Sequence, residues 1–180
     1  LNKLEKFYGG IANLKKLPDA LFIIDIKKEK NSVKESGEMK IVTVRPTMVL
    51  GKNTYLPHAP IEFIKTALAH KDIEIYGEGR HEREWIWIDD VAEGILKAVE
   101  YGTVAEPGYY PFFLSSNRIS MRDLATKVAS RLESKVVFTP STTQAFTLTS
   151  NFSESQKLLK WFPKNNIDDI IEKLVNIFNS

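Results

Sequence analysis

The chain has 180 residues, of which 43% are hydrophobic, 27% charged and 11% aromatic, and its net charge is only +2; this indicates one globular domain and gives no sign of DNA binding. With no cysteine and three scattered histidines, disulfides and cysteine nucleophiles are excluded and a zinc or other metal site is not expected. Since no apolar run approaches the ~20 residues of a membrane span and the N-terminus has no signal-peptide core, we expect a cytoplasmic or organellar-matrix protein.

Helical and strand-like segments alternate from the start of the chain. Residues 1–16 have a helix-like apolar spacing that Gly9 and Gly10 interrupt, and the wholly apolar run 21–24 is typical of a strand buried on both faces. A short helix over 27–36 and a second buried strand over 41–44 follow. This order is the repeating unit of parallel α/β sheets, so we expect 21–24 and 41–44 to be adjacent parallel strands.

Beyond residue 51 the sequence predicts further helices and strands. The clearest helix begins at Ser120, which with Asp123 resembles a capping box. Asp89 or Asp90 is placed to cap an earlier helix, a role that we favour over a catalytic carboxylate pair. The expected buried stripe of that helix is Val91, Ile95, Ala98 and Val99, and the other expected elements are helices over 61–68 and 167–178 and strands over 73–76, 85–88, 110–114 and 136–138.

The sequence lacks two patterns that nicotinamide chemistry needs. A dinucleotide-binding α/β unit has a glycine-rich turn after its first strand, and none of the nine glycines supplies one. A short-chain dehydrogenase has a tyrosine followed four residues later by a lysine that lowers the phenol pKa, and none of the six tyrosines is so followed. We therefore expect no catalytic residue in this chain and no cofactor bound by it alone.

An anion site is the remaining candidate. Arg80 and Arg83 stand in a glycine-flanked loop near Trp85, where a guanidinium could grip a diphosphate and an aromatic face could pack on a ring. The alternative is an exposed turn whose arginines pair with neighbouring glutamates. Arg45 could face a ligand at the carboxyl end of its strand, where open parallel sheets bind ligands, or it could be a structural strand end.

Several runs occur in the order seen in one known family: IVTVRPTMVLG at 41–51, IEFI at 61–64, IYGEG at 75–79, REWIWIDDVA at 83–92 and KLLKWFP at 157–163. Residues 38–180 thereby resemble the carboxyl-terminal half of the extended short-chain dehydrogenases, the nucleotide-sugar epimerases and dehydratases that use NAD or NADP.

The resemblance implies a Rossmann-like parallel sheet flanked by helices, with a small carboxyl-terminal α/β substrate-binding part. Arg83 matches the arginine that binds the nucleotide-sugar diphosphate, and Arg45 matches the strand end at the substrate cleft, which Trp85 and Arg80 would also line. The chain departs from the family in three places: Met48 stands where asparagine is usual, Leu50 stands where tyrosine is usual, and the segment 141–146 lacks the expected second phosphate-binding arginine.

The first 36 residues resemble a different protein. LEKFYGGI at 4–11, LPDALFIID at 17–25 and KEKNSVKE at 28–35 are similar to a stretch of the second protein of the small ribosomal subunit, also an α/β fold. We therefore expect a chimera of residues 1–37 and 38–180 that shares one core.

Two functions remain open. The first is a substrate-binding remnant of a nucleotide-sugar epimerase or dehydratase, inactive alone, whose partners could be a nucleotide sugar and a complementing chain. The second is a non-catalytic structural or scaffold protein, either ribosome-associated or a designed α/β chimera.

Overall fold

The computed structural model describes residues 40–54, 56–141, 146–147 and 150–179. The helix–strand–helix segment expected within residues 1–36 lies outside the described residues, and so does the expected pairing of 21–24 with 41–44. No helix in the described part of the chain is long and apolar enough to cross a membrane.

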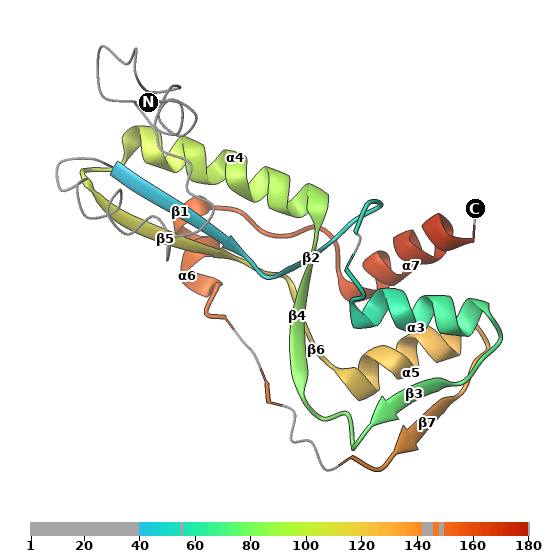
Figure 1. The fold of residues 1–180 in the computed structure, drawn as a ribbon. Helices are drawn as coiled ribbons and strands as arrows, with labels where there is room; N and C mark the ends of the chain where they lie inside the picture. The colour runs from blue at the N-terminus through green and yellow to red at the C-terminus, as the bar shows by residue number, and fades with distance from the viewer. Residues whose placement is uncertain (1–39, 55, 142–145, 148–149, 180) are drawn as a thin grey trace, which may run out of the picture.

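The described residues form a mixed α/β structure (Figure 1). Its strands are β1 (Lys40–Pro46), β2 (Met48–Leu50), β3 (Ile73–Tyr76), β4 (Glu82–Trp87), β5 (Gly108–Leu114), β6 (Asn117–Ser120) and β7 (Val136–Thr139). Its helices are α3 (Ala59–Leu68), α4 (Ile88–Val104), α5 (Met121–Arg131), α6 (Ser153–Leu159) and α7 (Ile167–Phe178).

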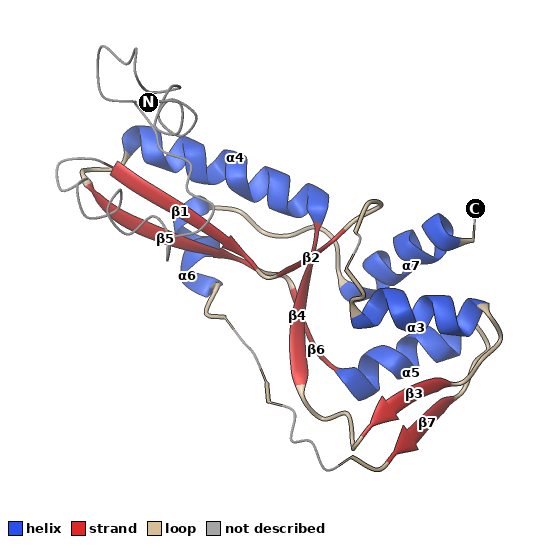
Figure 2. Cartoon of the chain, in the orientation of Figure 1, coloured by secondary structure: helices blue, strands red, loops and turns tan. Residues whose placement is uncertain are grey.

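The strands form three small sheets with mainly parallel pairing (Figure 2). β1 pairs in parallel with β5, β2 with β4, and β3 with β7, whereas β4 and β6 are antiparallel. The helix α4 connects β4 to β5 and packs on both β1 and β5. The parallel, helix-covered sheet expected from the sequence is therefore confirmed.

Two hydrophobic cores lie on either side of the central strand β4. The larger one joins α3, α5 and α7 around Trp85 and Leu124, which are 1% and 0% exposed. The smaller one joins α4 to β5 around Phe112 and also contains Trp161. Successive side chains of a strand point to opposite faces. Trp85 therefore packs into the larger core and its neighbour Ile86 into the smaller one, so both cores share the strand β4.

The predicted elements outside the masked residues are largely confirmed, but α4 differs in two ways. Its N-cap is Trp87 rather than Asp89 or Asp90, so the predicted cap is wrong. Val99, predicted in the buried stripe, is 57% exposed. Gly94 faces the sheet instead, since a Cβ atom there would lie 2.7 Å from a methyl carbon of Leu114.

Three short elements were not predicted. They are β2 and β6, of three and four residues, and the seven-residue helix α6. A three-residue strand and a seven-residue helix carry too few side chains to show a period, and β6 has fewer apolar residues than the equally short β3 and β7. Two of them matter for the site, because β2 and β6 are the strands that flank β4.

Candidate anion-binding site

A pocket of about 310 Å³ lies where β1 and β5 end and the chain passes to the next sheet. Thr47 joins β1 to β2 and its backbone N–H donates to the carbonyl of Leu114 at 3.0 Å, which holds this crossing in place. The pocket is lined by Arg45, Pro46, Thr47, Met48, Arg83, Glu84, Phe113 and Ser150. It thus lies at the carboxyl ends of parallel strands, where open α/β sheets commonly bind ligands.

Arg45 reaches the pocket from the end of β1. Its Nη2 donates to the Tyr109 hydroxyl at 2.8 Å, and its guanidinium carbon lies 5.4 Å from the centre of the Phe113 ring. These partners are neutral, so they orient the guanidinium without cancelling its charge.

Arg83 reaches the same pocket from β4. Its Nη1 donates to the carbonyls of Glu82 and Phe146, and its guanidinium carbon lies 5.6 Å from the centre of the Phe146 ring. Carbonyls and an aromatic ring hold this guanidinium as well. Arg83 therefore keeps the positive charge that an anionic ligand would need.

The acid beside Arg83 does not offset that charge. Glu84 is 4% exposed, and its carboxylate forms an ion pair with Arg118 at 3.0 Å. The two residues are directly opposite each other in the antiparallel pair β4–β6. Because Arg118 balances Glu84, the described residues that line the pocket carry a net positive charge from Arg45 and Arg83.

The structure brings together only two of the four residues proposed from the sequence. Arg45 and Arg83 line the pocket, whereas Trp85 packs in the larger core with its indole Nε1 buried. Arg80 lies in the turn between β3 and β4 and pairs with Glu78 at 2.7 Å, with both side chains well exposed. This ion pair is the exposed-turn alternative considered above for Arg80.

Glycines shape that turn rather than a phosphate-binding loop. Gly77 and Gly79 have φ angles of 71° and 65°, a backbone conformation that side chains with a Cβ rarely adopt. They lie in the turn that leads from β3 into β4, where Arg83 is the second residue.

Four of the pocket residues had no functional signal in the sequence. They are Thr47, Glu84, Phe113 and Ser150. Ser150 lies 66 residues from Glu84, whose carboxylate accepts its backbone N–H. Only the folded chain shows this contact.

The positive charge of Arg83 also affects the pKa of His81, the residue just before β4. The pKa of His81 is lowered from its usual value, first by partial burial and then by the positive charge of Arg83. His81 is therefore less readily protonated in the folded chain.

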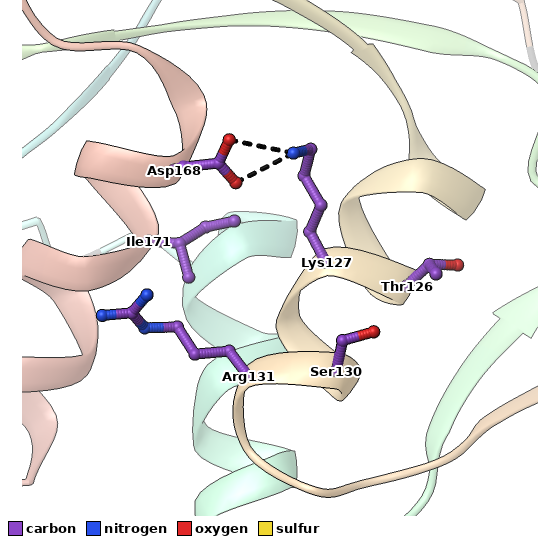
Figure 3. A pocket seen from close by; sticks show the side chains of 6 residues that line it. All are labelled: Thr126, Lys127, Ser130, Arg131, Asp168 and Ile171. Atoms are coloured by element: carbon purple, nitrogen blue, oxygen red, sulfur yellow. Dashed lines mark hydrogen bonds and ion pairs between the residues drawn. The ribbon is translucent and has the colours of Figure 1, made fainter.

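A second hollow of about 390 Å³ lies between α5 and α7 (Figure 3). Lys127 Nζ contacts both carboxylate oxygens of Asp168 at 2.9 Å, and Arg131 pairs with Glu172 at 3.3 Å. Because acids already neutralise both cations, this hollow suits helix-to-helix ion pairing rather than anion binding.

The fold is that of the nucleotide-sugar epimerases and dehydratases. The UDP-glucuronic acid 4-epimerase of Bacillus cereus, solved with UDP-glucuronic acid and NAD, matches with a TM-score of 0.69 and 20% identity over 85% of this chain. The UDP-glucose 4-epimerase of Thermotoga maritima, solved with UDP-glucose, matches with a TM-score of 0.68 and 17% identity over 85% of this chain. These matches cover 49% and 50% of the two enzymes, so the chain spans about half of their length.

Comparison of the sequence separates two parts. Residues 28–110 match the model of the NAD dependent epimerase/dehydratase family, and residues 1–47 match that of ribosomal protein S2. The small ribosomal subunit protein uS2 of Wigglesworthia glossinidia brevipalpis is 54% identical over 41 residues, which are 23% of this chain and 17% of that protein. An uncharacterised protein of Methanocaldococcus jannaschii is 26% identical over 144 residues, which are 78% of this chain and 43% of that protein.

The chain therefore combines a segment similar to ribosomal protein S2 with a remainder similar to the epimerases and dehydratases. Both resemblances stated from the sequence are confirmed.

Proposed function

We propose that the chain binds a nucleotide sugar through its diphosphate, as the substrate-binding part of an epimerase- or dehydratase-like protein. One observation carries this proposal: Arg45 and Arg83, 38 positions apart, line the same pocket, and the partners that they have among the described residues are neutral. A diphosphate offers several anionic oxygens, and planar guanidinium groups bind such oxygens through paired charge-assisted hydrogen bonds.

Arg45 could take the place of a phosphate-binding arginine that the sequence lacks. The family's second phosphate-binding arginine is missing from segment 141–146. We propose that Arg45 supplies the second guanidinium from β1, and that Phe113 offers an apolar surface beside it. The sugar nucleotides in the solved structures of two proteins with this fold support this ligand class.

We propose further that these 180 residues alone turn over no nucleotide sugar and bind neither NAD nor NADP. The cofactor supplies the hydride chemistry in such enzymes, and the protein must hold its pyrophosphate and place a tyrosine for proton transfer. The sequence has neither a suitable glycine turn nor a tyrosine followed four residues later by lysine.

Calorimetry with UDP tests the binding proposal. Arg83→Ala and Arg45→Ala should each weaken UDP binding by about 10- to 100-fold, since a hydrogen bond to a charged group contributes about 1.5–3 kcal/mol. Arg131→Ala, which removes a guanidinium of the α5–α7 hollow, is the matched control and should bind UDP as the parent does. Unchanged affinity in both pocket variants would refute the proposal, and a loss on Arg80→Ala alone would move the site to the exposed turn.

A second candidate function rests on the match of residues 1–47 to ribosomal protein S2. Under this alternative the chain is a non-catalytic structural protein that associates with the ribosome. Co-sedimentation with small ribosomal subunits separates the two candidates. The ribosomal alternative predicts that the chain sediments with the subunits, whereas the substrate-binding proposal predicts that the free chain binds UDP without them.

A further inference from the structure

Glu84 collects hydrogen bonds from three separate segments that surround the pocket. Its Oε1 accepts from Nε and Nη2 of Arg118 at 3.2 and 3.0 Å. Its Oε2 accepts from the hydroxyls of Ser115 and Ser150 at 3.2 and 2.6 Å. The backbone N–H of Ser150 lies 3.1 and 3.0 Å from the two oxygens. β6, the end of β5 and the segment before α6 are thus all fixed to one buried carboxylate.

The contact with Ser150 bears directly on Arg83. Phe146, four positions earlier, supplies the carbonyl to which Arg83 donates and the ring over which its guanidinium lies. Four residues span at most about 14 Å, so anchoring Ser150 limits where Phe146 can lie. Glu84 and Arg83 are neighbours on β4, and the anchor and the guanidinium therefore share one rigid strand.

The network also reaches the other side of the pocket. Thr47 Oγ1 lies 3.4 Å from the hydroxyl of Ser115, which in turn donates to Glu84. Thr47 follows directly on Arg45 and Pro46 at the end of β1. One carboxylate is therefore linked to the backbone near both guanidinium groups.

We propose that Glu84 is a positioning residue for the anion site: by holding Ser150 it restricts the position of Phe146, whose carbonyl and ring contact the Arg83 guanidinium. This inference rests on the proposed function. Glu84 touches no ligand in this role, because hydrogen-bond donors already surround both of its oxygens. A carboxylate suits the position because it only accepts, whereas a glutamine amide would point an N–H group at one of these donors.

Glu84→Gln tests the inference with little change in side-chain volume, and Asp168→Asn is the matched control. Asp168 also loses a charged ion-pair role when changed to an amide, but it pairs with Lys127 in the α5–α7 hollow, away from the anion pocket. Glu84→Gln should weaken UDP binding at least tenfold, whereas Asp168→Asn should leave it unchanged. Should Glu84→Gln not fold, Ser150→Ala removes only the 2.6 Å hydrogen bond and should lower UDP affinity in the same direction.

A double-mutant cycle separates positioning from an independent effect. If Glu84 acts through Arg83, the variant Glu84→Gln/Arg83→Ala should bind UDP no more weakly than Arg83→Ala alone. Losses that multiply would show that Glu84 acts independently of Arg83 and would overturn the inference, as would full affinity in Glu84→Gln.

A ligand-free measurement keeps the inference testable if UDP does not bind at all. Phe146 is 67% exposed, and chymotrypsin cleaves after accessible phenylalanines. Cleavage after Phe146 should be several-fold faster in Glu84→Gln than in the parent or in Asp168→Asn. If the parent does not bind UDP but cleavage accelerates, the proposed function fails and the anchoring role of Glu84 stands. If cleavage is unchanged in Glu84→Gln, the anchoring role is wrong whatever the ligand.

Discussion

Replacing Asp90 should lower the free energy of unfolding, because its carboxylate has a structural rather than a catalytic role. Asp90 is 1% exposed in the first turn of α4, and its carboxylate accepts from the backbone N–H groups of Lys164 and Asn165 at 2.9 and 3.2 Å. It also accepts from the side-chain amide of Asn165 at 2.9 Å. These bonds fasten the loop between α6 and α7 to α4, so both oxygens are occupied by structural contacts.

The structure sets the size of the effect. A hydrogen bond to a charged group contributes about 1.5–3 kcal/mol, but the freed donors of this loop partly regain water, so we take about 1 kcal/mol for each of the three bonds and expect a loss of about 3 kcal/mol in Asp90→Ala. For a chain of this length, that corresponds to a fall in Tm of about 6–12 °C. Urea unfolding followed by circular dichroism measures the loss in the free energy of unfolding.

Asp89→Ala is the control for this comparison. Asp89 is exposed and accepts one hydrogen bond, from the indole Nε1 of Trp87 at 3.0 Å. Its replacement should cost less than about 1 kcal/mol. Equal losses in the two variants, or a loss below 1 kcal/mol for Asp90→Ala, would refute the assignment of Asp90 as the clamp of this loop.

Three further predictions concern packing, pH and the N-terminal segment. Gly94→Ala should lower the Tm although alanine has the better helix propensity, because the new Cβ would lie 2.7 and 2.9 Å from two methyl carbons of the buried Leu114. Gly102→Ala on the same helix, where the new Cβ would lie 3.1 Å from its nearest neighbour, should lower the Tm less. A raised Tm for Gly94→Ala would contradict this packing. The pKa of His81 is lowered in the folded chain, so the unfolded chain binds the His81 proton more readily and the free energy of unfolding should fall as the pH drops below about 6.5. The variant His81→Gln should show a smaller fall. An identical pH profile in the variant would show that His81 does not cause the pH dependence. Ile23 lies outside the described residues, and we propose from its apolar run that residues 1–37 share one core with the rest; Ile23→Asp should then unfold the whole chain in one transition, whereas an unchanged melting transition for residues 40–180 would show two independent parts.

Local sequence signals predicted the elements whose stabilising contacts are also local. The Ser120 hydroxyl accepts the N–H of Asp123 at 3.0 Å, which is the N-cap half of the predicted capping box, while the Asp123 carboxylate accepts from the Ser120 hydroxyl at 2.7 Å. The helix α7 follows its apolar period and begins at Asn166, which forms a capping box with Asp169. A cap needs only residues three positions apart, so the sequence contains all the information for it.

The same signals failed for α4 because distant residues compete for its groups. Asp90 has the right residue type for a cap, but Lys164 and Asn165 occupy its carboxylate. Val99 fits the helical period, but Gly94 faces the sheet and lets the helix approach β5 closely. Local signals likewise did not show that Arg45 and Arg83 line one pocket, which only the resemblance to the epimerases implied; their placement depends on the parallel pairing of the three-residue strand β2 with β4.

Strand geometry explains why Arg83 keeps its charge although glutamates stand on both sides of it. Considered as a loop, the sequence 82–84 suggested that Arg83 would pair with these neighbours. It lies in β4 instead, and the Glu84 carboxylate bonds Arg118, Ser115 and Ser150 rather than Arg83. The antiparallel register then places Arg118 opposite Glu84, and these two charges neutralise each other. Pairing between β4 and β6, rather than the local sequence, therefore leaves Arg83 free to act with Arg45 on an anion.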